Sequence, residues 1–407
     1  MRILWVSPRF LHPTNRGAQI RTLEMLKRLH ARHEVHYLGF SDPAQPEGPE
    51  RSHEYCTRAY AIPHEAPLRR SPKFAAQLAA NLLSSMPLSL SRYRSTAMRD
   101  KISELRAATE FDCVVSDFLT PAPNFADMSK VVLFQHNVET MIWRRHFEHA
   151  RDPLRKAYFR TQAERMEDWE GRMCRAAARV IAVSLQDAET MRKMFAVEAV
   201  SVPTGVNLEY FRRPQNPPPA ADLVFVGSMD WMPNSDGVNY FVRKILPLIW
   251  ERKPGCTLAI VGRSPSPAMQ AQAKQESRIQ VTGTVPDVRP WLWGAGVSIV
   301  PLRIGGGTRL KIYEAMAAGT ATVSTSIGAE GLDVTHPANI RLADSPNDFA
   351  AQCLALLDDA SLRQSVADEA LRLVTSHFSW DVVTAEFERL LAVSTVSAAD
   401  VPITKFG

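Results

Sequence analysis

Short apolar runs alternate with longer stretches of helical period along most of the chain. In the first half, the apolar runs lie at residues 2–7, 34–40, 113–118, 130–137 and 179–184. Strands that are apolar on both faces are typical of a parallel sheet covered by helices on both sides. The repeated strand–helix units therefore predict a doubly wound, Rossmann-like α/β domain.

A proline-rich segment, RRPQNPPPAAD at 212–222, interrupts this alternation and predicts a linker. The alternation then restarts, with apolar runs at 223–228, 257–262, 279–285, 297–302 and 320–325. The pattern predicts two Rossmann-like domains that face each other across a cleft, with ligands at the carboxyl ends of the strands. The expected boundaries are domains 1–211 and 223–378, a last helix within 379–393 and a loose tail over 394–407.

Composition narrows the class of protein. The 407 residues are 45% hydrophobic and 22% charged, which suits two globular domains. The five cysteines are far apart and contain no C-x-x-C pair, which argues against a zinc or disulfide framework and favours a reducing cytosol. The opening MRILWVSPRF is typical of a buried strand, not of a secretory signal. No apolar run reaches the ~18 residues of a membrane span, so we expect a cytoplasmic protein.

Positive charge is concentrated in the first half. Residues 1–215 hold 32 Lys+Arg against 24 Asp+Glu, a net charge of +8, whereas residues 216–407 hold 16 against 19. The basic, partly amphipathic segment 68–99 suits peripheral contact with an anionic membrane surface, such as the inner face of the cytoplasmic membrane. An ordinary solvated helical face is the alternative. Nucleic acid is a weaker candidate, because aromatic residues do not interleave with these charges.

The stretch GGGTRLKIYEAM, residues 305–316, combines three glycines with the start of a predicted helix. Thr308 can cap this helix, which places Arg309 and Lys311 beside its positive N-terminus. A diphosphate would turn that unfavourable placement into a favourable one, and glycines let the backbone approach such a ligand. Glu314 shares a helix face with Lys311 and can accept hydrogen bonds from sugar hydroxyls. A solvated helix start with a Lys311–Glu314 surface pair is the alternative.

Several segments together resemble the retaining glycosyltransferases of family 4, which have the GT-B architecture of two Rossmann-like domains. The similar segments are PLRIGGGTRLKIYEAMAAGTATVSTSIGAEGL, VPTGVNLEYF, FVGSMDWMPNSDGVNYF, VTGTVPDVRPWL and QHNVE. GSMDWMPN together with GAEGL is also similar to a subgroup of sugar transferases associated with exopolysaccharide and exosortase systems. The resemblance implies a nucleotide-sugar donor, UDP- or GDP-linked, on the second domain and an acceptor on the first.

The resemblance also implies roles for individual residues. Glu314 would hold the nucleotide ribose, Arg309 and Lys311 would bind phosphate, and His136 would lie near the donor sugar with a catalytic role. The other implied donor-binding residues are Gly17, Gly227, Ser228, Arg263, Gly306, Gly307, Thr308 and Glu330. Taken alone, His136 follows a strand, where a His-Asn pair is often a capping turn. Asp117, also at a strand end, is expected to be structural, and the run 164–170 and Asp187 are expected to form a solvated helical face.

Two departures from the family pattern bear on the donor site. Gly306 stands where the family often has a second glutamate, which leaves the identity of the donor sugar open. Ser228 and Asn234 stand where the family often has an arginine and a lysine. Two usual diphosphate cations are therefore missing, and Arg309, Lys311 and Arg263 would have to replace them. Arg309 is the first choice because the planar guanidinium binds phosphate in a bidentate manner.

These features predict a glycosyltransferase that moves a sugar from a nucleotide-sugar to a lipid-linked or polysaccharide acceptor. We expect retention of the anomeric configuration and no metal, since the chain has no Asp-x-Asp motif and protein cations can stabilise the leaving phosphate. Two alternatives stay open: a nucleotide-sugar epimerase of the same shape, and a non-catalytic nucleotide-sugar-binding partner, which Gly306 favours. A dehydrogenase is disfavoured, because no G-x-G-x-x-G follows either first strand.

Overall fold

A computed structural model describes residues 1–14, 17–64, 71–150, 152–304 and 310–393. Contacts divide the chain into two compact units. The first unit contains Met1–Pro203 and Val383–Gly407, and the second contains Thr204–Val382. The proline-rich segment 212–222 lies inside the second unit, and the last helix, α17 (Trp380–Val393), runs from the second unit into the first.

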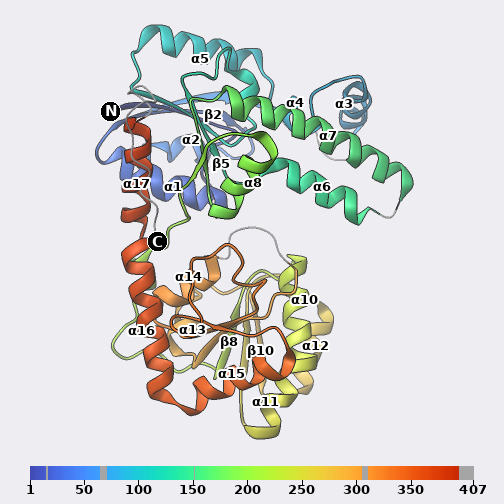
Figure 1. The fold of residues 1–407 in the computed structure, drawn as a ribbon, viewed down its shortest axis with the longest axis vertical. Helices are drawn as coiled ribbons and strands as arrows, with labels where there is room; N and C mark the ends of the chain where they lie inside the picture. Colours follow the sequence, from blue (N-terminus) through green and yellow to red (C-terminus); the bar gives the residue numbers. More distant parts are fainter. Residues whose placement is uncertain (15–16, 65–70, 151, 305–309, 394–407) are drawn as a thin grey trace. The chain divides into compact units, whose positions relative to one another are not determined.

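The first unit is built on a seven-stranded parallel sheet of order β3-β2-β1-β4-β5-β6-β7. Helices cover both of its faces (Figure 1). The strands are β1 (Arg2–Ser7), β2 (Glu34–Ser41), β3 (Arg58–Pro63), β4 (Cys113–Asp117), β5 (Val131–Gln135), β6 (Arg179–Ala182) and β7 (Ala199–Ser201). In β4 and β5 every residue is buried, which explains why these strands are apolar except at their carboxyl ends.

The helices of the first unit begin with capping side chains at several N-termini. Ser71, Ser95, Asp152 and Ser184 each accept a hydrogen bond from the backbone N–H three residues on. The helices are α1 (Gly17–His30), α2 (Glu47–Glu50), α3 (Pro72–Leu82), α4 (Leu88–Ser91), α5 (Thr96–Ala108), α6 (Glu139–His149), α7 (Pro153–Ala176) and α8 (Leu185–Phe195), with short 3-10 turns at Ser52–Glu54 and Ala122–Asn124.

The second unit has a six-stranded parallel sheet of order β10-β9-β8-β11-β12-β13. Its strands are β8 (Leu223–Val226), β9 (Leu258–Val261), β10 (Ile279–Gly283), β11 (Val297–Val300), β12 (Thr322–Ser324) and β13 (Arg341–Leu342). Its helices are α9 (Leu208–Phe211), α10 (Met232–Tyr240), α11 (Leu246–Arg252), α12 (Pro267–Gln275), α13 (Arg289–Gly294), α14 (Leu310–Ala317), α15 (Pro346–Asp358) and α16 (Ala360–His377), with a π-turn at Phe241–Ile245.

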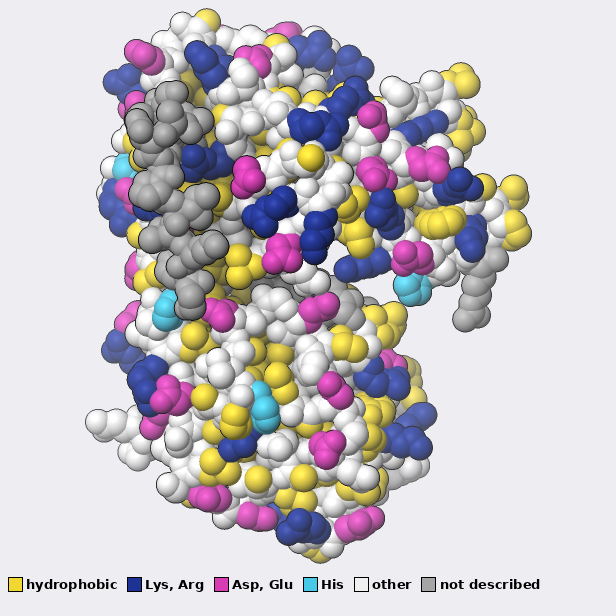
Figure 2. All heavy atoms as spheres, viewed as in Figure 1, with side chains coloured by type: hydrophobic (Ala, Val, Ile, Leu, Met, Phe, Trp, Pro, Cys, Tyr) yellow, Lys and Arg dark blue, Asp and Glu magenta, His cyan; other side chains and the backbone are white. Residues whose placement is uncertain are grey.

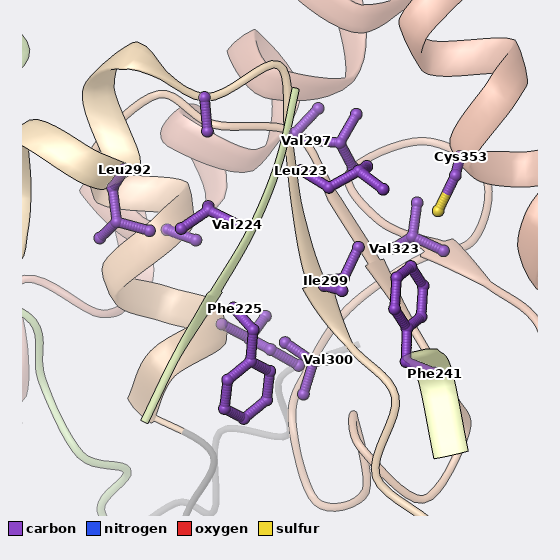
Figure 3. Close-up of a cluster of buried hydrophobic side chains, with 14 of the residues drawn as sticks. Leu223, Val224, Phe225, Phe241, Leu292, Val297, Ile299, Val300, Val323 and Cys353 are labelled. Atoms are coloured by element: carbon purple, nitrogen blue, oxygen red, sulfur yellow. The ribbon is translucent and has the colours of Figure 1, made fainter. Parts of the chain in front are cut away.

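The core of the second unit forms where the central strands meet the helices. Side chains from β8, β11 and β12 pack together with Phe241 and Cys353 (Figure 3). Leu223, Phe225 and Val323 are fully buried in this cluster. The apolar core therefore holds the central strands in place, and the loops that follow them carry the polar groups described below.

The predicted architecture of two parallel, doubly wound α/β units is confirmed. Sequence patterns did not indicate β3, β7 and β13. β3 is an edge strand whose residues are largely exposed, and the other two contain only three and two residues. Several predicted strands extend one or two residues beyond the observed ones, into the loops that carry the candidate site. Among the described helices, none combines the length and the apolar character needed to span a bilayer.

Candidate functional site

The order of the strands marks one position in each sheet where ligands are expected. In a doubly wound sheet, ligands bind beyond the carboxyl ends of the strands, where the chain reverses its direction of progress across the sheet. This reversal occurs between β1 and β4 in the first unit and between β8 and β11 in the second. Polar side chains gather at the carboxyl ends of both strand pairs.

In the second unit, Lys311 is held directly beyond the end of β8. Its Nζ donates to Asn234 Oδ1 at 2.6 Å, and Asn234 Nδ2 donates to the backbone oxygen of Ser228 at 2.8 Å. A Cβ at Gly227 would lie 2.8 Å from both Lys311 Nζ and Asn234 Nδ2, so a side chain here would displace these two side-chain ends. Asn234, which stands where the family often has a cation, therefore positions the ammonium of Lys311.

Arg263, which follows β9, reaches the same turn. Its Nε donates to Ser228 Oγ at 2.7 Å, and the same nitrogen lies 3.3 Å from Asp230 Oδ2. The side chain of Arg263 is 56% exposed, so a ligand can reach it. The glycine–serine turn after β8 thus brings together two cations from different parts of the second unit. This is the charge that a diphosphate requires.

Glu314 lies one helical turn after Lys311, on α14. Its side chain is partly buried, and burial raises the pKa of this carboxyl, while the nearby Lys311 lowers it by a smaller amount. Within the described residues, the Glu314 carboxylate makes no hydrogen bond. The Lys311 ammonium donates to Asn234, so the arrangement observed differs from the simple Lys311–Glu314 surface pair of the alternative interpretation. A buried acceptor of this kind is suited to hydroxyl donors from a ligand.

The structure describes only some of the other residues that were predicted to bind the donor. Gly306, Gly307, Thr308 and Arg309 lie outside the described residues. Glu330 is exposed in the loop after β12. The side chain of Thr325 anchors this loop to the segment after β11, because its Oγ1 donates to the backbone oxygen of Leu302. The same oxygen accepts from the backbone N–H of Gly328 within the loop.

In the first unit, a buried polar cluster joins α1, β1, β4 and β5. His136 Nε2 lies 2.7 Å from Asp117 Oδ1, and Arg21 Nη1 lies 3.2 Å from His136 Nδ1. Asp117 also accepts from Ser7 Oγ at 3.0 Å and from Thr22 Oγ1 at 3.3 Å. All five side chains belong to buried residues. The cluster fixes the first turns of α1, which begins at the exposed Gly17, against the ends of these strands.

These contacts determine the tautomer of His136. A guanidinium can only donate, so Nδ1 must carry the lone pair and accept from Arg21. The proton is then on Nε2, which donates to the Asp117 carboxylate. Arg21 stays charged at neutral pH, although burial lowers its pKa to about 10. Both ring nitrogens of His136 are therefore engaged within the protein, and neither is directed at a substrate.

We predict that His136 stays neutral under mildly acidic conditions. Burial lowers the pKa of His136 below its usual 6.5, and this effect outweighs the opposing effect of Asp117. The unfolded chain then takes up the proton first. The contribution of this group to stability is therefore lost as the pH falls from 6.5 toward the folded-state pKa. NMR of histidine-labelled protein should show an Nε2–H ring at pH 6.5, and a ring that is half-protonated there would contradict the assignment.

The ring of Phe118 covers one face of His136. The two ring centroids are 3.9 Å apart, and the planes differ by 12°. Phe118 reaches this position with φ of +73°, a left-handed backbone that is unusual for an aromatic residue. Strained backbone of this kind often occurs at functional sites, where the surrounding contacts keep it in place. The left-handed backbone at the end of β4 therefore places the Phe118 ring against the His136 imidazole.

Two expectations from sequence need correction here. The run 164–170 was predicted to be a solvated face, but Glu170 is fully buried. It accepts from the backbone N–H groups of Glu139 and Thr140 at 2.9 and 2.8 Å and from Thr140 Oγ1 at 2.6 Å, which satisfies the N-terminus of α6. Asp187, also predicted to be solvated, is only partly exposed and accepts from Ser184 Oγ at 2.8 Å.

Sequence reasoning missed Glu139 as a titratable group of this edge. Burial, together with the neighbouring Glu170, raises the pKa of Glu139 to about 7. The sequence signals for Glu139 were its position shortly after a buried strand and its place at the end of the segment QHNVE. Across the described parts of both units, no three His, Cys, Asp or Glu side chains are grouped closely enough to hold a metal ion.

Two parallel, doubly wound units, the second with cations gathered at its strand ends, form the layout of GT-B proteins. Family models agree with this assignment: "Glycosyltransferase Family 4" matches residues 15–210, and "Glycosyl transferases group 1" matches residues 220–359. The two models together account for most of the chain. The chain belongs to glycosyltransferase family 4.

Two curated relatives show more distant similarity. A phosphatidyl-myo-inositol mannosyltransferase of Mycolicibacterium smegmatis is 27% identical over 236 residues, which are 56% of this chain and 60% of the relative. An uncharacterized protein from the cps region of Klebsiella pneumoniae is 24% identical over 165 residues, 39% of this chain and 42% of the relative. The matched regions thus span between two fifths and three fifths of these relatives.

Solved structures share the fold over nearly the whole chain. HepE of Anabaena in complex with UDP has a TM-score of 0.63 at 14% identity, covering 96% of this chain and 100% of that one. Sucrose-phosphate synthase of Thermosynechococcus elongatus has a TM-score of 0.65 at 16% identity, covering 96% and 98%. At these identities, the similarity establishes the GT-B fold.

Proposed function

We propose that the protein transfers a sugar from a UDP- or GDP-linked donor to a lipid-linked or polysaccharide acceptor, with retention of the anomeric configuration. The donor binds to the second unit and the acceptor to the first. We place the reaction in exopolysaccharide or cell-surface glycan synthesis, within the subgroup associated with exopolysaccharide and exosortase systems. The protein would act in the cytoplasm, at the inner face of the cytoplasmic membrane.

One observation carries this proposal. Asn234 holds the Lys311 ammonium against a glycine beyond the end of β8, and one helical turn later the partly buried carboxylate of Glu314 makes no hydrogen bond within the described residues. A cation that is fixed next to space without a side chain suits a phosphate group. A buried carboxylate acceptor suits the vicinal hydroxyls of a ribose. A nucleoside diphosphate carries both groups at a short separation.

The chemistry of transfer needs positive charge at the leaving group. Breaking the anomeric C–O bond places negative charge on the departing diphosphate and positive charge on the sugar. Lys311 and Arg263, joined by Arg309, stabilise the departing phosphate in this proposal. Because they are held before the reaction starts, these cations bind the transition state more tightly than the ground state. With protein cations in this role, transfer proceeds without a metal ion.

The other predicted donor-binding residues keep their roles as part of the proposal. Backbone N–H groups of Gly306, Gly307 and Thr308 contact the donor in this proposal, as do the turn residues Gly227 and Ser228, together with Glu330 and with Gly17 of the first unit. His136 supports the site through its neutral ring, because Arg21 and Asp117 occupy both of its nitrogens. The leaving phosphate then takes the proton of the acceptor hydroxyl, on the same face of the sugar.

The relatives support the finer parts of the proposal. Structures of HepE have been solved with UDP and with UDP-glucose, which favours a UDP-linked hexose as the first donor to try. The Klebsiella relative comes from a cps region, and the Mycolicibacterium relative is named for transfer to a phosphatidylinositol. Both names favour a glycan or lipid acceptor. The basic segment 68–99 is the part of the chain that we propose contacts the membrane.

The test of this proposal is the stereochemistry of the product. The protein is incubated with UDP-glucose or GDP-mannose and an alkyl glycoside acceptor, and the product is examined by proton NMR. We expect a new glycoside with the anomeric configuration of the donor. A product of opposite configuration would exclude retention. Conversion of the donor to its epimer would favour the epimerase, and binding without turnover would favour the non-catalytic partner.

A further inference from the structure

Arg92, at the end of α4 in the first unit, has no anionic partner within the described residues. Its Nε is buried there without a hydrogen bond. The local sequence supplies no carboxylate, because residues 66–99 contain no Asp or Glu. The guanidinium lies over the ring of Phe74, at 5.9 Å from the centroid, which is near the outer limit of a cation–π contact. Since buried polar groups are normally paired, this arginine is suited to an anion that the protein itself does not provide.

Two neighbouring polar atoms are also buried without a partner in the described part of the chain. They are Gln77 Oε1 on α3 and Ser89 Oγ on α4. Ser89 lies one helical turn before Arg92. Gln77 shares a face of α3 with Phe74 and Asn81, and Asn81 donates to the last residue of α4 at 3.5 Å. The face of α3 that is turned toward α4 therefore leaves an acceptor, a hydroxyl and a guanidinium incompletely satisfied.

His64 and Tyr93 lie next to Arg92 and carry polar atoms that a ligand can use. The ring of His64 contacts those of Phe40 and Tyr93, with centroids 4.7 and 5.4 Å apart. Burial, and secondly the charge of Arg92, lower the pKa of His64 below its usual 6.5, so the ring is neutral at pH 7. A neutral imidazole offers one donor and one acceptor. Both His64 and Tyr93 are partly exposed, and neither side chain makes a hydrogen bond within the described residues.

These residues lie at the edge of the first sheet where ligands are expected. His64 directly follows β3, and Phe40 lies at the carboxyl end of β2. Neighbouring strands are about 4.8 Å apart, so His64 lies about 12 Å from the switch point between β1 and β4. A short oligosaccharide spans such a distance. Figure 2 shows Lys and Arg side chains at the surface of this part of the first unit, around α3 and α4 in Figure 1.

We propose that Arg92, His64 and Tyr93 form a subsite that binds an acidic sugar unit of the acceptor glycan. The terminal nitrogens of Arg92 bind the carboxylate of this sugar, because Nε is turned into the protein. His64 and Tyr93 exchange hydrogen bonds with its hydroxyl groups. The inference rests on the proposed function insofar as it names the class of acceptor. Binding of the acidic sugar itself requires neither donor nor turnover.

The set of side chains favours a carboxylate sugar over a simple phosphate. Phosphate sites usually gather several cations or the N–H groups of a helix N-terminus. Here one guanidinium stands beside a neutral imidazole and a phenol. The planar guanidinium matches one planar carboxylate, and the neutral groups match hydroxyls. A uronic acid carries both kinds of group on one ring.

The test is a ligand-observed NMR titration of the full-length protein without nucleotide. Methyl β-glucuronide, methyl β-glucoside and inorganic phosphate are compared at matched ionic strength. We expect the glucuronide to bind most tightly, and Arg92→Gln to weaken its binding at least about tenfold, since hydrogen bonds between charged groups are lost. Arg92→Lys should keep part of the affinity. The matched control is Arg94→Gln, which removes an exposed arginine two residues on and should leave binding unchanged.

A milder pair of variants guards against loss of folding. His64→Gln and Tyr93→Phe retain the charge of Arg92 and should weaken binding of the glucuronide and the glucoside alike. Thermal unfolding of every variant shows whether the first unit is intact. The inference is overturned if phosphate binds as tightly as the glucuronide, if Arg92→Gln and Arg94→Gln bind the glucuronide equally well, or if Arg92→Gln weakens only the binding of anionic lipid vesicles.

Transfer assays separate this inference from the proposed function. With glucuronide and glucoside acceptors, Arg92→Gln should raise KM for the acidic acceptor only and leave kcat unchanged. Glucuronide binding that depends on Arg92, without transfer to either acceptor, would support the subsite and contradict the proposed function. Transfer to both acceptors with equal KM would support the proposed function and overturn the subsite.

Discussion

Replacing Glu314 with glutamine should lower kcat/KM for the nucleotide-sugar by about 10- to 150-fold while raising the melting temperature of the free protein at neutral pH. The loss follows because hydrogen bonds to a charged acceptor contribute about 1.5–3 kcal/mol. The gain follows because the wild-type carboxylate is buried without a hydrogen bond from the described residues, and burial raises its pKa. Glutamine keeps the shape of the protonated acid without the charge.

The difference in melting temperature between Glu314→Gln and wild type should depend on pH. The folded-state pKa of Glu314 is raised above the usual 4.5, so its contribution to stability is full below pH 4.5 and is lost as pH rises through the folded-state pKa. Glu314→Gln should therefore melt higher than wild type at pH 7.5 and equally at pH 4. Glu251→Gln, on the exposed end of α11, is the matched control. Full activity of the Glu314→Gln variant would contradict a role for Glu314 in donor binding.

Replacing Lys311 with alanine should lower kcat by about 10²–10³-fold with a smaller effect on stability. Removal of one electrostatic group that stabilises developing charge typically costs about 2.7–4 kcal/mol of barrier. Lys311 is held in place beside the turn after β8, since Asn234 accepts from it at 2.6 Å and Gly227 leaves room beside it. Steady-state kinetics with the donor sugar measures the effect.

Two further variants test whether the position of Lys311 matters. Lys274→Ala removes an exposed lysine from α12 of the same unit and should leave kcat unchanged. Gly227→Ala places a Cβ 2.8 Å from the Lys311 ammonium and should displace it. Because the end of a lysine chain can move at little cost, this variant should fold normally yet lose activity. Normal turnover by Gly227→Ala would show that Lys311 acts from another position or not at all.

The strands and the order of the two units could be predicted because buried parallel strands are apolar on both faces. The runs VVLF and CVV are examples, and both are fully buried. The pairing of Asp117 with His136 could not be predicted, since it joins the ends of neighbouring strands and depends on the register between them. Glu170 was misassigned because a charged run on a helix gives no sign that one of its members faces inward.

In the second unit, too, sequence patterns could indicate some features of the candidate donor site but not others. The roles predicted for Lys311 and Glu314 stay predictions, whereas the interpretation of Asn234 as a lost cation was incomplete, because Asn234 accepts from Lys311. Asparagine at this position accepts from Lys311 across 77 residues of sequence, and no local pattern reveals such a contact. The residues on which the family pattern depends most, Gly306 to Arg309, lie outside the described residues, so their roles remain predictions.

The most direct test of the central claim is thermal unfolding with UDP, GDP and ADP, in EDTA and in Mg²⁺, for wild type, Arg309→Ala and Lys311→Ala. A ligand at about 100 times its dissociation constant adds about 2.7 kcal/mol of stability, which raises the melting temperature by several degrees. We predict a shift with UDP or GDP that is the same in EDTA and is lost in both variants. No shift with any nucleotide, or a shift that requires Mg²⁺, would contradict a metal-independent nucleotide-sugar site in the second unit.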